Sequence, residues 1–341
     1  MGRENDMKAY LQKNKIAIVA VATLIAIALV LSQKTYYALI IAPFGVYAIV
    51  AISLDILFGY TGQISLGHAG LFAIGAYVTT LCTMRVGIPS LISLVLGAIA
   101  TMLVGFLVAI PASKLVKHFL SLLMIAFGQM VYLIVNTWTP VTGGSLGIGS
   151  IPYLNLCGWV LNSNLENSIF IWALVALSMI AKNRIIDSRT GRAFIAIREN
   201  PVAARGLGID VRLYKIMAFG ISAFLTGMAG GLYAFLRGFI SPETFNGTQS
   251  TLFMTMLLFG GITTTAGPVI GAAVLLLVKE LFQSMSIYQG LIYALFILVV
   301  LFFFPNGAVG VYYNFRKKLA KKRGQKITKD ADSVKEVSEH A

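Results

Sequence analysis

The sequence predicts an all-α polytopic membrane protein with about eight full transmembrane helices and one broken or re-entrant helix pair. Hydrophobic residues occupy 57% of the 341 positions and charged residues only 12%, whereas soluble domains carry about a quarter charged residues. The mean hydropathy is +0.82. The apolar runs approach the roughly 20 residues that a helix needs to cross a bilayer, and they are too long for barrel strands. The net charge of +14 lies in the segments that join or flank these runs, so it indicates membrane topology rather than nucleic-acid binding.

The N-terminal segment 1–15 has four basic residues against two acidic ones, so the positive-inside rule places it in the cytoplasm. The first apolar run lacks a signal-peptide cleavage pattern and is expected to stay as a helix. Seven crossings are predicted in the first two thirds of the chain, at 16–32, 36–58, 64–84, 88–112, 119–138, 166–181 and 215–236.

The charges of the connecting segments test this count. Segments 113–118 and 182–214 should then be cytoplasmic, and segments 139–165 and 237–250 should lie outside. Segment 139–165 contains no lysine or arginine, whereas 182–215 contains eight. The alternation of sides agrees with the charges.

The last third contains an interrupted apolar region. Segment 316–329 has eight basic residues and no acidic one, which predicts a cytoplasmic C-terminus and an odd number of crossings between 251 and 304. The run 286–304 is one full span, but 251–278 is divided by GGITTTAGP into two pieces of about 13 residues, each short for a crossing. We expect a broken or re-entrant pair there; the alternative is ten spans, if both halves cross. The membrane part is then a single permease domain, 16–310, followed by a basic, disordered cytoplasmic tail, 311–341.

The chain has no predicted catalytic or cofactor site. It lacks even a Gly-Lys dipeptide, so it has no Walker A loop and cannot hydrolyse ATP by itself. Its three histidines are scattered without metal-ligand spacing. We expect a non-catalytic membrane subunit that needs neither metal nor cofactor.

Two ionisable residues within the predicted membrane region, Asp55 and His68, are candidates for the transport route; the alternative for each is local pairing near the interface. A second glycine-rich interruption, GYTGQISLGHAG at 59–70, precedes the third span. Together with GGITTTAGP it fits an inverted repeat with the substrate route between its halves, although the two stretches share little beyond glycine. The further route candidates are Gln63, Ser65, Gly260, Gly261 and Thr264.

The charged stretch 191–215 is the one long polar segment between apolar runs. Asn200 can cap a helix that starts at Pro201, and Gly206 and Gly208 stand where it would stop, which predicts a surface helix of about two turns. Its small and apolar residues, such as Val202 and Leu207, suit contact with a soluble partner. The alternative is an ordinary solvated loop. We interpret the flanking arginines as topology anchors.

Three blocks carry a resemblance to a known family: GYTGQISLGHAGLFAIGAY (59–77), GRAFIAIRENPVAARGLGIDVRLYKIMAFGISAFLTGMAGGLYAF (191–235) and SPETF (241–245). The chain resembles the permease subunits of bacterial branched-chain amino acid ABC transporters, of the LivM type, from about residue 40 to about residue 310. The resemblance implies a multi-pass protein of the bacterial inner membrane that forms part of an import pathway. It also implies four partners or partner sets: a second, related permease subunit in a heterodimer, two cytoplasmic ATP-binding subunits, an extracytoplasmic substrate-binding protein, and membrane lipid.

The resemblance also places candidate contact residues. The expected ATPase contacts are Glu199, Pro201, Ala203, Ala204, Gly206 and Gly208. The expected binding-protein contacts, on the outer side, are Thr142, Gly143, Gly144, Pro242 and Glu243.

Two departures from the family pattern concern the ligand: Leu146 replaces a frequent polar residue, and Gly261 is followed by Ile262 and three threonines. The alternatives are therefore a permease of the same kind for urea, short amides or another amino acid. A stand-alone transporter driven by an ion gradient is the alternative from another class. It would need carboxylates along a membrane pathway, and only Asp55 approaches that.

Overall fold

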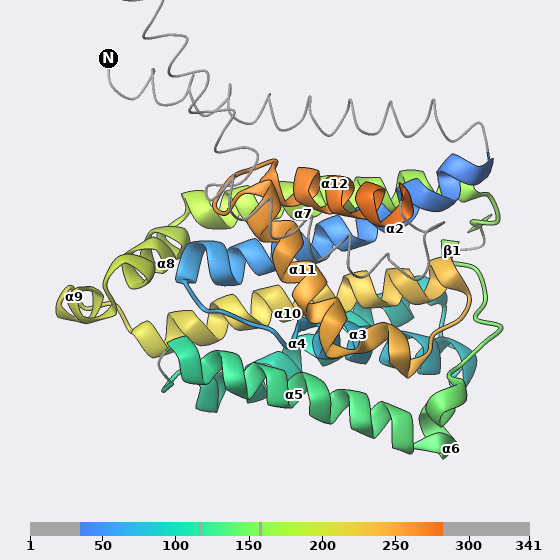
Figure 1. The fold of residues 1–341 in the computed structure, drawn as a ribbon, viewed down its shortest axis with the longest axis horizontal. Coiled ribbons are helices and arrows are strands. Elements are labelled where there is room, and N and C mark those ends of the chain that lie inside the picture. Colours follow the sequence, from blue (N-terminus) through green and yellow to red (C-terminus); the bar gives the residue numbers. More distant parts are fainter. Residues whose placement is uncertain (1–34, 116, 157–158, 282–341) are drawn as a thin grey trace, which may run out of the picture.

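A computed structural model describes residues 35–115, 117–156 and 159–281, and over these the chain is almost entirely helical (Figure 1). The only strands among these residues are β1 (Asn155–Leu156) and β2 (Trp159–Val160), a short antiparallel pair in a connecting segment. The helical elements are α2 (Thr35–Leu54), η1 (Asp55–Tyr60), α3 (His68–Met84), α4 (Ser90–Ala112), α5 (Lys117–Thr137), α6 (Thr139–Thr142), η2 (Gly144–Leu146), α7 (Asn164–Asp187), α8 (Arg189–Glu199), α9 (Pro201–Gly206), α10 (Val211–Arg237), η3 (Pro242–Phe245), α11 (Gly247–Gly260) and α12 (Gly267–Leu281).

Within the described residues, five helical stretches are long and apolar enough to cross a membrane: Ile40–Tyr60, Ser90–Ala112, Phe119–Thr137, Asn164–Asp187 and Val211–Arg237. Helix α3, predicted as a crossing from residue 64, begins only at His68 and has 17 residues, which is at the short limit for a span. The predicted crossings 16–32 and 286–304, the segment 1–15 and the tail 311–341 lie outside the described residues. The protein is thus an all-helical, multi-pass membrane protein.

Helices α2 and α10 form the centre of the bundle. α10 packs against α4, α3 and α2, and α2 packs in turn against α7 and α12. The membrane stretches of α2 and α10 are 83% and 78% buried, whereas those of α4, α5 and α7 are about a third buried. The close approach of α3 to α10 depends on glycine, because a Cβ on Gly75 would collide with the backbone of Gly227. The apolar outer faces of α4, α5 and α7 suit lipid or neighbouring subunits.

The long helices run between two ends that differ in composition (Figure 1). At one end, α8 and α9 project from the bundle, and Arg198 of α8 contacts Gly59 at the end of η1. At the other end, Ile148 and Ile240 form an antiparallel bridge with N–H···O distances of 2.9 and 3.0 Å, and Arg85 donates to the carbonyl of Pro140. The structure therefore gathers the two segments predicted outside, 139–165 and 237–250, at the end opposite to the charged segment.

The α7–α8 region differs from the prediction, whereas the break in the last third agrees with it. Helix α7 continues to Asp187 instead of ending at residue 181, so Lys182 lies inside a membrane-length helix. The apolar pattern stops at Lys182, but the helix continues to Asp187, and Ser188 follows as its C-cap. Helix α8 was not predicted as a separate helix; Ser188 caps it by accepting from Thr190 N–H at 3.2 Å. The expected break in 251–278 is present, since α11 ends at Gly260 and α12 begins at Gly267.

Candidate functional site

The α8–α9 segment has the cap that the sequence predicts. Asn200 lies between the two helices, and its side-chain oxygen accepts from the N–H groups of Val202 at 2.9 Å and Ala203 at 3.1 Å. Pro201 occupies the first turn of α9. Gly208 has φ of +80°, a left-handed conformation that glycine adopts without strain. The helix has six residues, somewhat less than the two turns expected.

Helix α9 presents apolar side chains to the outside. Val202 is 76% exposed and Leu207 79% exposed, and Ala203 is also exposed. Ala204 is 1% exposed, because it packs in a small cluster with Ile197 and Val211. The side chain of Ala204 thus holds α9 onto the bundle, and the ATPase contact at this residue stays a prediction. The other residues predicted to contact the ATPase, Glu199, Pro201, Gly206 and Gly208, are exposed or half-buried.

Asp55 forms a buried ion pair. Its Oδ2 lies 2.5 Å from Nζ of Lys182 on α7, and both side chains are 0% exposed. Charges within a membrane protein need such a partner, because the cost of desolvating an unpaired ion is several kcal/mol. The partner is 127 positions away in sequence, so this is a long-range pair instead of the local pairing expected near the interface, and a place for Asp55 on the transport route stays a prediction. Lys182, counted in the sequence with the cytoplasmic charges, belongs to this interior pair.

The ion pair also contacts the break between α11 and α12. Asp55 Oδ1 accepts from the N–H of Thr263 at 2.7 Å, and Lys182 donates to the carbonyl of Thr264 at 2.8 Å. Thr263 has φ of +59°, uncommon for a residue other than glycine. Gly260 lies where a Cβ would collide with the Gly267 carbonyl, so this helix end must be glycine. Gly261 follows with φ of +107°.

The other predicted route residues near the start of α3 belong to a neutral cluster. His68 Nδ1 lies 2.7 Å from Ser65 Oγ, and His68 Nε2 lies 2.9 Å from Ser222 Oγ. Thr226 Oγ1 donates to the Ser222 carbonyl at 2.9 Å and lies 2.8 Å from Ser53 Oγ. These five side chains are buried and join α2, α3 and α10. Gln63, also buried, donates to Thr61 Oγ1 and to the carbonyl of Lys215.

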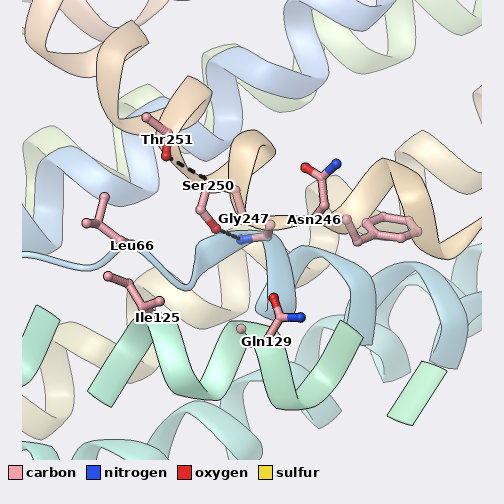
Figure 2. A pocket seen from close by; sticks show the side chains of 10 residues that line it. Leu66, Ile125, Gln129, Asn246, Gly247, Ser250 and Thr251 are labelled. Atoms are coloured by element: carbon pink, nitrogen blue, oxygen red, sulfur yellow. Dashed lines mark hydrogen bonds between the residues drawn. The ribbon is translucent and has the colours of Figure 1, made fainter. Parts of the chain in front are cut away.

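A cavity of about 250 Å³ lies beside these groups, between α3, α5, η3 and α11. Figure 2 shows Ile125 and Gln129 rising from α5 towards Leu66 and the start of α11. The Oγ of Ser250, at its wall, accepts from Ala69 N–H at 2.9 Å, so the first turn of α3 and the first turn of α11 meet here (Figure 2). The described residues of the lining combine amides and hydroxyls with apolar side chains, and none of them is charged: Leu66, Ala69, Ile125, Gly128, Gln129, Phe245, Asn246, Gly247, Ser250 and Thr251.

The residues predicted to contact a binding protein lie at the opposite end but are mostly covered. Thr142, Gly144 and Pro242 are buried, Gly143 is half-buried, and only Glu243 is exposed. Thr142 donates to the carbonyls of Val135 and Trp138, so its role here is local. The exposed large side chains at this end include Trp138, Leu146, Tyr153 and Phe239.

Sequence reasoning missed three residues of this site: Lys182, Arg198 and Ser222. Arg198, interpreted as a topology anchor, instead donates to the Gly59 carbonyl at 2.5 Å. Lys182 and Ser222 act on partners 127 and 154 positions away. The one available signal was the position of Lys182 directly at the end of an apolar stretch, two residues before Arg184.

Comparison with known proteins identifies the family. Residues 36–304 match the family described as branched-chain amino acid transport system / permease component. The chain is 30% identical over 303 residues to the high-affinity branched-chain amino acid transport system permease protein LivM of Salmonella typhimurium, covering 82% of this chain and 71% of that protein. It is 27% identical over 284 residues to LivH of Escherichia coli, covering 77% of this chain and 91% of that one.

A more distant relative, the autoinducer 2 import system permease protein LsrC of Photorhabdus luminescens, is 27% identical over 219 residues and 62% of each chain. No solved structure matches the chain. The match over most of the chain, together with the all-helical bundle and its interrupted helices, places this chain in the family of branched-chain amino acid transport permeases.

Proposed function

We propose that this chain is the permease subunit of an ATP-binding cassette importer that moves branched-chain amino acids into a bacterial cell. It pairs with a second permease subunit, as the separate LivM and LivH relatives suggest. Two cytoplasmic ATP-binding subunits supply the energy, and an extracytoplasmic protein delivers the substrate. This chain itself takes no part in ATP hydrolysis.

The observation that carries the proposal is the exposed apolar surface of α9. Val202 and Leu207 are large apolar side chains held out from the charged end of the bundle by a capped helix. Large apolar side chains are unfavourable in water, and burial in a groove on a soluble domain would remove them from it. The α8–α9 segment is therefore the site at which an ATP-binding subunit docks, and the bundle end that carries it faces the cytoplasm.

The cavity next to α3 and α11 supports the substrate class. A wall of amides and hydroxyls beside apolar side chains suits a small molecule with a polar head and an aliphatic side chain. The lack of charged groups among the lining residues suits a ligand with no net charge, such as a zwitterionic amino acid. Urea and short amides would use the polar wall and leave the apolar one unfilled.

The ion-driven alternative is less favoured because Asp55 is already neutralised by Lys182 at 2.5 Å. A carboxylate that carries a proton or sodium ion must release its present partner and bind an ion from the transport route. The pair instead holds backbone groups of the α11–α12 break.

Transport by the complete complex in proteoliposomes tests the proposal. Uptake of leucine, isoleucine or valine should require ATP on the side of the ATP-binding subunits together with the binding protein, and it should persist when proton and sodium gradients are collapsed. Uptake that follows an imposed gradient without ATP would replace the proposal with the secondary-transporter alternative. Uptake of urea in preference to leucine would overturn the substrate class alone.

A further inference from the structure

The break between α11 and α12 leaves peptide groups that no helix satisfies, and its neighbours provide the partners. Asp55 accepts from Thr263 N–H, Tyr60 donates its hydroxyl to the Thr263 carbonyl at 3.1 Å, and Lys182 donates to the Thr264 carbonyl. Thr263 itself is exposed, and these contacts attach the backbone of Thr263 and Thr264 to η1 and α7. The break therefore cannot shift without η1 and α7.

The same neighbours are attached to α8. Lys182 lies on α7, which ends at Asp187 and is followed, after Ser188, by α8. Arg198, in the last turn of α8, donates to the Gly59 carbonyl in η1. Helix α8 thus has two attachments to the surroundings of the break, one through the chain and one through a hydrogen bond.

Burial gives this arrangement its stiffness. Asp55 and Lys182 are both fully buried, and drawing them apart would leave two uncompensated charges in an apolar interior. Gly59 contributes by having no side chain, since a Cβ there would collide with the Asp55 carboxylate. The Lys182 ammonium also lies 5.8 Å from the centre of the Tyr60 ring, a cation–π distance.

We propose that Asp55, Lys182 and Arg198 form a rigid node that carries the movement of α8–α9 to the α11–α12 break. The three are positioning residues: they touch neither nucleotide nor substrate, and they make the break follow the helix to which an ATP-binding subunit docks. The inference rests on the proposed function, and it adds the residues that link ATP hydrolysis to transport.

The test measures the number of amino acids transported per ATP hydrolysed by the complete complex in proteoliposomes. Arg198→Met removes the link between α8 and η1 and leaves the buried ion pair in place. We expect this ratio to fall several-fold while ATP hydrolysis continues. The matched control is Arg192→Met on the same helix: Arg192 is exposed, and its guanidinium donates to the Asp187 carbonyl at 3.5 Å, so the ratio should stay at the wild-type value.

A disulfide can replace the link reversibly. A Cβ on Gly62 lies 4.0 Å from the Arg198 Cβ, within the roughly 3.5–4.5 Å that disulfides span. In a background with Cys82→Ser and Cys157→Ser, the pair Gly62→Cys and Arg198→Cys should have a low ratio when reduced and recover towards the ratio of that background when oxidised. Gly62→Cys alone, the control, should not respond to oxidation.

The outcomes separate the two proposals. A wild-type complex that transports with ATP, together with an Arg198→Met complex of unchanged ratio, would overturn the node and leave the proposed function standing. Loss of transport on oxidation of the cysteine pair would mean that the contact opens during the cycle, and it would also overturn the rigid node. A wild-type complex that does not use ATP would overturn the proposed function itself.

Discussion

Two polar clusters in the described part of the bundle differ in charge and in the elements they join. In the charged cluster, the buried pair of Asp55 and Lys182 binds the backbone of Thr263 and Thr264, and it joins η1 and α7 to the broken helix pair. The neutral cluster, Ser53, Ser65, His68, Ser222 and Thr226, joins α2, α3 and α10.

The difference shows what each cluster can do. A buried ion pair is costly to break and has no stable intermediate arrangement, so it suits a rigid connection. Hydroxyls and a neutral imidazole can exchange partners at small cost, so the second cluster suits close packing of three central helices. The charged cluster thus lies at the connection between η1, α7 and the α11–α12 break, which we propose to be rigid.

The largest effect should come from removing one charge of the pair. Asp55→Asn or Lys182→Met leaves the other ion buried without compensation, which costs about 3–5 kcal/mol. We expect either single variant to lower the midpoint of thermal unfolding of the detergent-purified complex strongly. The double variant should be more stable than either single one. Equal unfolding midpoints for single and double variants would show that the charges are not coupled.

A smaller loss should follow in the neutral cluster. His68→Leu leaves the Ser65 and Ser222 hydroxyls without their partner, at about 1–3 kcal/mol for each unsatisfied group. The same unfolding measurement should show a shift below that of Asp55→Asn. Thr137→Val is the control, because its exposed hydroxyl bonds carbonyls of its own helix. A shift for His68→Leu larger than for Asp55→Asn would reverse the comparison.

A third effect isolates one hydrogen bond of the neutral cluster. In a double-mutant cycle of Ser53→Ala and Thr226→Val, the coupling between the two hydroxyls should be about 0.5–1.5 kcal/mol, the usual net value of such a bond. A coupling near zero would mean that each hydroxyl is satisfied by its own helix carbonyl. Each hydroxyl has a single proton and a helix carbonyl within reach, Val50 for Ser53 and Ser222 for Thr226, so the bond between them forms only when one of the two gives up its carbonyl.

The smallest effect lies outside both clusters, at the cap of α9. Asn200→Ala removes the acceptor for two N–H groups and should cost about 1 kcal/mol, confined to that helix. Hydrogen exchange should become faster in residues 202–208 while the global unfolding midpoint stays unchanged. Asn200→Asp, which retains the acceptor, should exchange like the wild type. A global change would show that α9 is integral to the bundle.

The sequence alone predicts much of the fold, for local reasons. The cap at Asn200 and the break around GGITTTAGP follow from residues that act within a few positions, and the side alternation of segments 139–165 and 182–215 follows from charge. The pairing of Asp55 with Lys182 does not, because it depends on how α2 and α7 pack across 127 positions. The same holds for Arg198, because the local sequence around a charged residue is the same whether its side chain lies in water or donates to a carbonyl.

The burial of the predicted contact residues was equally beyond local reasoning. Ala203 and Ala204 are adjacent alanines on a short helix, and only the packing of Ile197 and Val211 decides which of them faces outward. At the other end, Thr142 and Gly143 form part of the turn after α5: Thr142 donates to the Val135 carbonyl, and Gly143 is the left-handed residue that ends α6.

Site-specific crosslinking at α9 tests whether an ATP-binding subunit docks on this helix. In the assembled complex, with the native cysteines replaced by serine, Ala203→Cys should crosslink to an ATP-binding subunit, and Ala204→Cys, buried against the bundle, should not. We expect crosslinking from Ala203→Cys alone, because only this one of the two side chains faces outward. A complex that transports with ATP but gives no crosslink from Ala203→Cys, Val202→Cys or Leu207→Cys would contradict it.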